Sequence, residues 1–298
     1  MAKKMKPELN LLVAMLIFGS IGIFVKNINL PSTAIVLWRT IIGSTFLALV
    51  FLLTKQPINL QGIKDNLALL IAAGIVLGGG WALLFEAFRL TTVSIAILLH
   101  YCAPVVVFIL SPILFQEKMT VHKVIGIIAA ILGMVIINAT GVGGTGFSSG
   151  VVCALASAVL YASLMILNKF LKGLSGLEST FFQLIIAMLV MAIYTGITTG
   201  RVLHIPTGHD VILVGTVGIL HTGIACYIYF SSMQKLPGQT IAIMSYIDPA
   251  STLIFSAIFL QERLTILQIV GALLILGGTA FSQLSKVHRQ SIEHGINA

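Results

Sequence analysis

The chain has 298 residues, of which 58% are hydrophobic and 9% are charged, and its mean hydropathy is +1.07. Soluble domains carry roughly 25% charged residues, so this chain has too few polar groups to cover a surface that faces water. Its net charge of +8 comes from basic residues that stand mostly singly between apolar stretches. That pattern is typical of membrane topology signals and excludes an extended nucleic-acid-binding surface.

The apolar runs predict ten spans, because a helix needs roughly 20 residues to cross a bilayer. Proline and glycine breakers separate most of the runs, and Thr265 and Gln268 have the spacing of a capping box at the start of the last one. The sequence thus predicts an all-α integral membrane protein with ten transmembrane helices. They cover residues 9–27, 33–54, 66–87, 92–115, 121–140, 149–169, 178–199, 210–231, 239–260 and 265–284.

Lysine and arginine residues predict the orientation of these spans. With the N-terminus inside, the inner segments carry 12 of them and the outer segments carry 4, while Arg39 lies within a span. Cytoplasmic segments of membrane proteins are enriched in Lys and Arg. We therefore expect a multi-pass protein of a bacterial inner membrane, with both termini in the cytoplasm.

One motif occurs twice in the chain. Residues 116–120 read Gln-Glu-Lys-Met-Thr and residues 261–265 read Gln-Glu-Arg-Leu-Thr, at an offset of 145. The first spans also correspond, since Phe18 matches Tyr161 and Arg39 matches Gln183. Five spans per copy is an odd number, so the second copy enters the membrane in the opposite sense. The sequence predicts two inverted five-helix repeats, residues 1–143 and 144–298.

The repeated block resembles the EamA-like domain of the drug/metabolite transporter superfamily. The resemblance covers nearly the whole chain, and it implies a ten-helix carrier with a central cavity between the halves. Many members of this superfamily export amino acids or other small metabolites. The chain departs from the family pattern in having an acid, Glu86, at the end of the third span. The matching strings run from Ile95-Ala96 through Pro104 to Glu117-Lys118, and from Ile241-Ala242 through Pro249 to Glu262-Arg263.

Two acids are the acidic candidates within the predicted spans, where an ionisable group costs roughly 2.5–3.5 kcal/mol at the helix centre. Glu86 either pairs with Arg89 at the interface or faces the cavity and binds an ammonium group or a proton. Asp248 either satisfies backbone groups freed by Pro249 or faces the cavity and titrates. The matching proline of the first repeat follows an alanine, which favours a functional role for Asp248.

Three basic candidates also lie inside spans. Arg39 either extends to the outer interface or holds a substrate carboxylate. His100 and His221 are either packing residues or groups that bond the substrate, and His100 is also a candidate for carrying protons. Neither histidine belongs to a pair at helical spacing, so the sequence predicts no metal site and no cofactor.

Aromatic residues near these positions are candidates for the cavity wall. Tyr101 and Tyr246 are counterparts in the two repeats and lie beside the two prolines. Trp81 offers an aromatic face to a cation. Tyr161 is either a packing residue or a further part of the wall.

The expected function is secondary active transport by alternating access, because the chain has no GxxxxGK[ST] loop for nucleotides. The two acids outnumber the single internal arginine, which favours a cationic or zwitterionic substrate. Glu86, Asp248 and His100 are the expected proton-coupling residues. We therefore expect a proton-linked exporter of amino acids or related small amine-bearing metabolites. The sequence also allows a homodimer.

Other functional classes remain as alternatives to this exporter. One is a passive facilitator of a small metabolite, and another is a haem or metal protein that uses His100 and His221. An intramembrane enzyme is less expected, since HExxH and paired carboxylates are absent from the sequence. Residues 141–146 fit GxGxxG and residues 146–150 fit GxSxG, but neither follows a predicted strand, so both are interpreted as a linker.

Overall fold

The computed structural model describes residues 7–115, 121–139, 148–199, 204–233, 244–245 and 247–295. Within these ranges the regular structure is entirely helical, which confirms the all-α prediction. Six helical segments are long and apolar enough to cross a membrane, and four shorter apolar helices accompany them. Together they give the expected membrane protein of about ten spans.

The long segments begin and end close to the predicted spans. They are α1 (Pro7–Lys26), α2 (Ser32–Thr54), α4 (Leu67–Leu90), α8 (Ser149–Phe170), α9 (Gly176–Thr199) and the continuous run of α10 (His209–Thr216), η1 (Val217–Ile224) and α11 (Ala225–Met233). The remaining helices are α3 (Leu60–Asp65), α5 (Val93–His100), α6 (Ala103–Phe115), α7 (Val121–Ala139), α13 (Ile247–Phe259) and α14 (Ile266–Gly295). The helix α3 was not predicted.

The expected single span over residues 92–115 is instead two helices, α5 and α6, with a break at Tyr101 and Cys102. Pro104 lies in the first turn of α6, where its missing N–H is tolerated. In the second repeat, Pro249 occupies the first turn of α13 in the same way. The two prolines therefore start new helices within the expected fourth and ninth spans.

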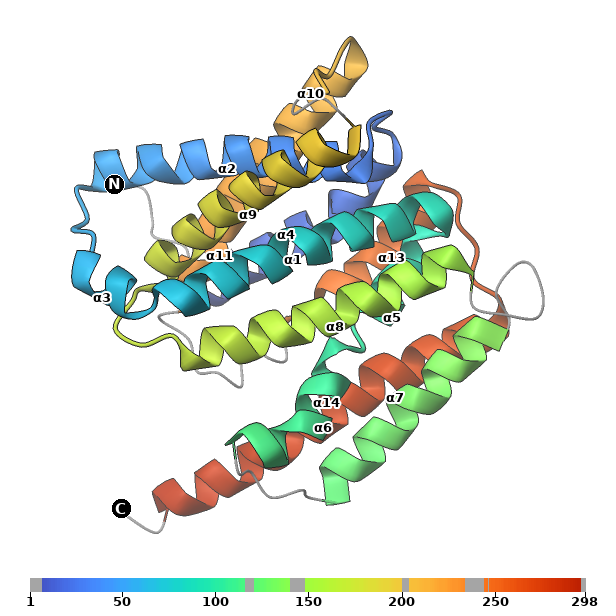
Figure 1. Ribbon diagram of the computed structural model, residues 1–298. Helices are drawn as coiled ribbons and strands as arrows, with labels where there is room; N and C mark the ends of the chain where they lie inside the picture. Colours follow the sequence, from blue (N-terminus) through green and yellow to red (C-terminus); the bar gives the residue numbers. More distant parts are fainter. Residues whose placement is uncertain are drawn as a thin grey trace.

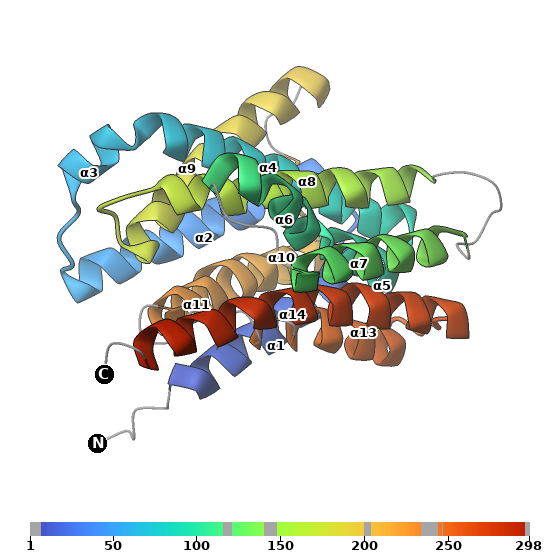
Figure 2. The same ribbon diagram turned by 90° about the horizontal axis from the view of Figure 1, so that it is seen from below.

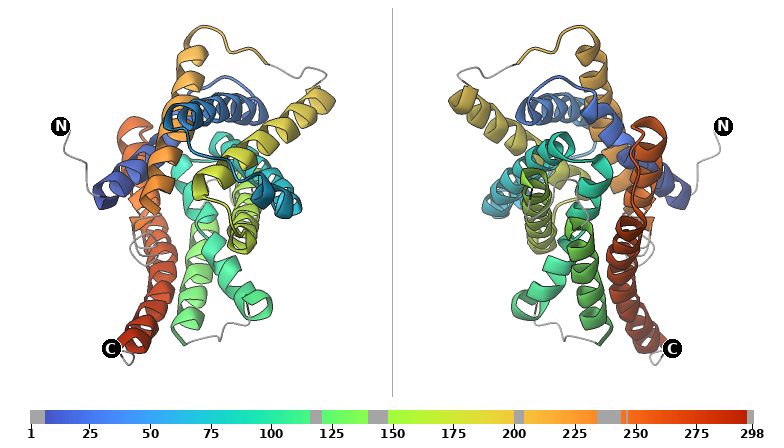
Figure 3. Two further views of the ribbon diagram at one scale, coloured as in Figure 1. Left: turned by 90° about the vertical axis from the view of Figure 1, so that its left-hand side faces the viewer. Right: turned by 90° about the vertical axis from the view of Figure 1, so that its right-hand side faces the viewer.

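The helix contacts follow the predicted repeat. The counterparts α2 and α9 pack together, and so do α7 and α14. The helix α4 packs against α8 and α9, while its counterpart, the run of η1 and α11, packs against α1 and α2. Figure 1 shows α7 and α14 side by side, and Figure 3 shows them extending with α6 away from the other helices. This exchange of contacts is what a twofold relation between the halves produces.

Loops predicted to share one membrane face are in contact. On the expected outer face, Asn29 N donates to Asp210 Oδ1 at 3.2 Å. On the expected inner face, Asn59 Nδ2 donates to Gly173 O at 2.9 Å. The start of α1 and the end of α14 lie toward the same side of the molecule (Figures 1 and 2). The relative sidedness of the segments is therefore consistent with the prediction, whereas the assignment of this side to the cytoplasm stays a prediction.

A carboxylate of the second repeat caps a helix of the first. Glu262 accepts hydrogen bonds from the backbone N–H groups of Val93 and Ser94, at 2.7 and 2.9 Å, and from Ser94 Oγ at 2.8 Å. These are the free N–H groups at the start of α5, where a negative charge is stabilising. Glu262 thus has a structural role as a cap, while its repeat counterpart Glu117 lies outside the described residues.

The predicted capping box at the last span is confirmed. Thr265 N donates to Gln268 Oε1 at 2.9 Å, and Gln268 N donates to Thr265 Oγ1 at 3.2 Å. The central linker, residues 140–147, lies outside the described residues, and Ser148 forms the N-cap of α8.

Close packing of α7 and α14 predicts a position-specific effect of adding one methyl group. A Cβ at Gly278 would lie 2.8 Å from Ala129 Cβ and 2.9 Å from Gly126 O. Gly278→Ala should therefore destabilise the protein by about 1–3 kcal/mol, as overpacking does, and lower its melting temperature in detergent. The adjacent Gly277 has nothing within 4 Å of such a Cβ, so Gly277→Ala is the matched control. Equal melting temperatures for the two variants would contradict this close packing.

The cap on α5 predicts a loss of stability on truncation. Glu262→Ala leaves two backbone N–H groups without their acceptor, which should cost about 1–3 kcal/mol. Glu262→Gln keeps an oxygen that accepts one of these bonds and should lie between wild type and Glu262→Ala. Thermal melting of the purified variants measures the effect, with Asp65→Ala at an exposed position as the control. The interpretation fails if Glu262→Ala melts at the temperature of this control.

Candidate functional site

Tyr101 and Asp248 join the two repeats inside the bundle. Tyr101 Oη donates a hydrogen bond of 2.7 Å to Asp248 Oδ2, across 147 positions of sequence. Tyr101 follows the last residue of α5, and Asp248 lies in the first turn of α13, where helix N–H groups favour a negative charge. Both side chains therefore occupy helix breaks set by the two prolines.

Further phenol groups lie near this pair. Tyr101 and Asp248 lie deep among the helices but remain partly accessible to solvent. The phenol groups of Tyr161 and Tyr229 are within range of electrostatic interaction with Tyr101. A carboxyl group among phenols, without an ion-pair partner in the described residues, can bind an ammonium group or a proton.

His100 is adjacent to Tyr101 but makes different contacts. Its Nδ1 lies 2.7 Å from Ser157 Oγ, and its ring stacks on that of Tyr161 with centroids 4.8 Å apart. The imidazole is buried and links α5 to α8. These contacts agree with the packing interpretation of His100, and they place Tyr161 against the imidazole.

Arg39 forms a second polar centre with η1 and α4. Its Nε donates to Thr222 Oγ1 at 2.9 Å, and its guanidinium carbon lies 3.8 Å from the centroid of the Trp81 ring. The centroid of the Phe85 ring lies 5.2 Å from the same guanidinium carbon. Arg39 is 3% exposed, so its side chain does not extend to the outer interface.

His221 is fully buried beside this centre. Its Nε2 lies 3.0 Å from Ser20 Oγ, and its ring packs edge-on against Phe24 with centroids 5.0 Å apart. His221 lies in the π-helical turn η1, and such wide turns are frequent at functional sites. The sequence did not predict this turn.

The helix α1 links the two centres. A Cβ at Gly19 would lie 2.9 Å from the carbonyl oxygen of Asp248, so α1 approaches the backbone of α13 closely at this point. The next residue, Ser20, contacts His221, which precedes the Arg39 partner Thr222. Two consecutive residues of α1 thus lie next to the backbone of Asp248 and next to the residue that precedes the Arg39 partner.

Glu86 lies apart from both centres. Its Oε2 accepts a hydrogen bond from Ser32 Oγ and lies 3.5 Å from Arg89 Nη1 in a partly exposed i,i+3 ion pair. These contacts match the interface interpretation of this residue. Glu86 therefore has a cationic partner in Arg89, whereas Asp248 has no cationic partner among the described residues.

Some of the site lies beyond what the sequence indicated. Ser20, Ser157 and Thr222 were not among the candidates, because hydroxyl residues in spans usually bond their own helix and give no distinctive pattern. The need of buried Arg39 for an acceptor was the one signal that pointed to a residue such as Thr222. Tyr246 lies outside the described residues.

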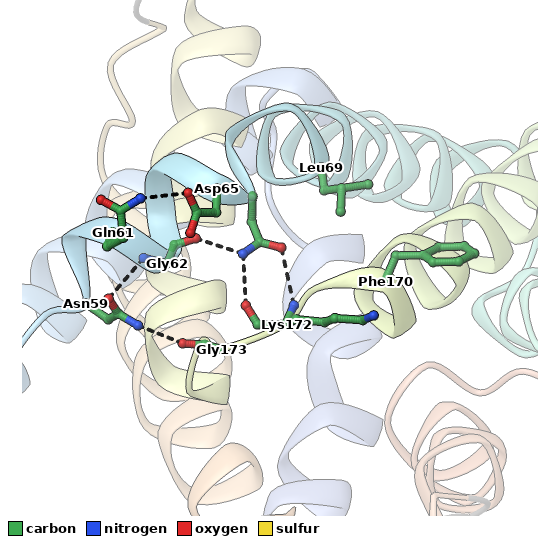
Figure 4. A pocket seen from close by; sticks show the side chains of 9 residues that line it. Asn59, Gln61, Gly62, Asp65, Leu69, Phe170, Lys172 and Gly173 are labelled. Atoms are coloured by element: carbon green, nitrogen blue, oxygen red, sulfur yellow. Dashed lines mark hydrogen bonds between the residues drawn. The ribbon is translucent and has the colours of Figure 1, made fainter.

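The cavity of about 680 Å³ shown in Figure 4 is at a different place, beside α3 and the loop after α8. Its polar groups bond one another: Asn66 Nδ2 donates to Lys172 O at 2.9 Å, and Lys172 N donates to Asn66 Oδ1 at 3.2 Å. Asn59 links to Gly173 in the same way. These bonds join the loops of the two repeats, so we assign the cavity a structural role. In the described part of the chain, no cluster of three His, Cys, Asp or Glu residues could hold a metal.

Comparisons with known proteins agree with this architecture. A crystal structure of a protein with 19% sequence identity superposes with a TM-score of 0.67 and covers 93% of this chain and 96% of that chain, which supports the fold alone. The uncharacterized transporter YxxF of Bacillus subtilis (strain 168) is 31% identical over 293 residues, covering 97% of this chain and 92% of that protein.

More distant relatives and a family model extend the comparison. An uncharacterized transporter of Archaeoglobus fulgidus is 24% identical over 272 residues, which are 91% of this chain and 94% of its own. The model of the EamA-like transporter family matches twice, over residues 5–139 and 148–283. This chain therefore belongs to the EamA-like transporter family.

Proposed function

We propose that this membrane transporter is a secondary active carrier that exports amino acids or related amine-bearing metabolites in exchange for protons. The observation that carries the proposal is the hydrogen bond between Tyr101 and Asp248. It joins the two repeats at helix breaks within the spans, and discontinuous helices of this kind commonly form the substrate sites of carriers.

Asp248 supplies the chemistry of exchange. Its carboxyl group has hydroxyl partners in the described structure, Tyr101 at 2.7 Å and Thr252 at 3.5 Å, and no cationic partner. An ammonium group and a proton would therefore compete for the same oxygen atoms. Such competition couples the release of one to the binding of the other.

The contacts of Glu86 and His100 make them weaker candidates for proton coupling than Asp248. Glu86 is held by Ser32 and Arg89 at the end of α4, and His100 is held by Ser157. Asp248 is thus the favoured proton-coupling residue of the three. Trp81, Tyr101 and Tyr161 provide aromatic surface on which a substrate can lie, and Tyr246 is assigned to the same wall by its correspondence to Tyr101.

The exchange also accounts for the two-repeat architecture. A site between two halves related by a twofold axis can open to either face by rocking of the halves. The Tyr101–Asp248 bond spans these halves, so its breakage and formation would accompany the motion. A passive facilitator would use the same motion without coupling it to a proton.

Replacing Asp248 tests the coupling. The probes are the 20 common L-amino acids, putrescine and choline, screened by thermal shift and then followed as uptake into proteoliposomes. For the wild type, an acidic vesicle interior should accelerate uptake, because protons leave as substrate enters. Asp248→Asn should abolish this acceleration, since an amide cannot carry the proton.

Asp65→Asn is the matched control, because Asp65 lies on the exposed α3 and should leave the pH response unchanged. If Asp248→Asn transports with the wild-type response to the pH gradient, the carboxyl group does not couple the proton. The passive facilitator then becomes the better description.

A further inference from the structure

Arg39 is a buried cation without an anion. It is 3% exposed, and within the described residues it takes part in no salt bridge. A guanidinium has five N–H donors, and here its single hydrogen bond is from Nε to Thr222. Charges inside a membrane protein are costly unless they are paired or serve a function. The missing anion is therefore a property of Arg39 that needs an explanation.

The fold does not require a charge at this position. The repeat counterpart of Arg39 is Gln183, which is 4% exposed and donates from Nε2 to Asn168 Oδ1 at 2.8 Å within its own repeat. The second repeat therefore folds with a neutral amide at this position of α9, which is the helix that corresponds to α2. The arginine is an addition to the shared architecture.

The free edge of the guanidinium is held in a defined orientation. Thr222 Oγ1 donates to Val217 O at 3.0 Å, which directs its lone pairs toward Arg39 Nε. The guanidinium also lies over the Trp81 ring, with its carbon 3.8 Å from the ring centroid. A Cβ at Gly43 would lie 2.4 Å from Thr222 Cγ2, so only a glycine allows α2 to approach η1 this closely.

In the part of the chain that the structure describes, the Arg39 Nη atoms have no acceptor. Two parallel N–H groups on one edge are suited to bidentate binding of a carboxylate.

We propose that Arg39 is the carboxylate subsite of the transport site, and that the substrate is a zwitterion that bridges Arg39 and Asp248. The inference rests on the proposed function, which assigns the ammonium group to Asp248. Gly19 of α1 approaches the backbone of Asp248, and the next residue, Ser20, contacts His221, which precedes the Arg39 partner Thr222. The proposal narrows the substrate to amino acids and excludes simple amines such as putrescine.

The test compares each common L-amino acid with its carboxamide, which keeps the ammonium group and loses the charge of the carboxylate. Binding to the purified transporter in detergent is measured by thermal shift over a range of ligand concentrations. The wild type should bind at least one amino acid more tightly than its carboxamide by about tenfold or more, the loss expected when a charge-assisted hydrogen-bond pair is broken. Wild-type binding without this preference would overturn the proposal, whatever the behaviour of any variant.

Arg39→Gln copies the residue of the second repeat and should fold. It should weaken binding of the amino acid by about tenfold or more and leave binding of the carboxamide unchanged. Arg39→Lys should give an intermediate value, because an ammonium cannot bind both oxygens in a fork. Arg89→Gln, at the exposed ion pair with Glu86, is the control and should bind as the wild type does. An unchanged carboxylate preference in Arg39→Gln would overturn the proposal.

Failure of this inference is distinguishable from failure of the proposed function. Suppose that Asp248→Asn loses proton coupling and that Arg39→Gln keeps the wild-type preference for the carboxylate. This result would overturn the Arg39 subsite and would still support the proposed proton exchange. Stabilisation by inorganic phosphate that disappears in Arg39→Gln, with no response to any amino acid, would keep an anion site at Arg39. That outcome would overturn both the carboxylate assignment and the amino-acid substrate.

Discussion

The structure depends on one constraint: inside a bilayer, a polar group must find its partner within the protein. No water is available there to replace a missing hydrogen bond. The hydroxyl residues of the spans satisfy this requirement locally, as Thr40 and Thr45 do by donating to carbonyl groups of their own helix. Where the helices break, side chains from the other repeat provide the partners. The Glu262 cap on α5 and the Tyr101–Asp248 bond both arise in this way.

The same constraint explains why the helices pack as closely as they do. Lipid tails are as apolar as leucine side chains, so helices associate through close contact and not through the hydrophobic effect. Glycines at the crossings make this contact, as at Gly133, where a Cβ would lie 2.5 Å from Gly271 O on α14. Close approach at Gly43 similarly brings Arg39 within reach of Thr222. Backbone packing therefore determines which polar side chains meet.

The differences between the repeats carry more functional information than their similarity. The shared elements are structural: the prolines that start α6 and α13, and the paired helices α7 and α14. The ionisable residues break the symmetry, since Arg39 corresponds to Gln183 and Asp248 to Ala103. A charge that one half needs and the other half does without is not part of the common framework. Asp248 approaches α1 at Gly19, and Arg39 bonds Thr222, which follows the Ser20 partner His221; we place the substrate between Asp248 and Arg39.

The sequence by itself determined the class, the approximate spans and the duplication, because a bilayer demands long apolar runs and a copied motif keeps its spacing. It also identified the ionisable residues, since each stands out against an apolar background. Only the tertiary structure decided how they pair. Glu86 joins Ser32 and Arg89, whereas Asp248 joins Tyr101, 147 positions away. The Tyr101–Asp248 bond depends on the break after α5, and the Arg39–Thr222 bond depends on the π-helical turn η1. Hydropathy and spacing encode neither feature.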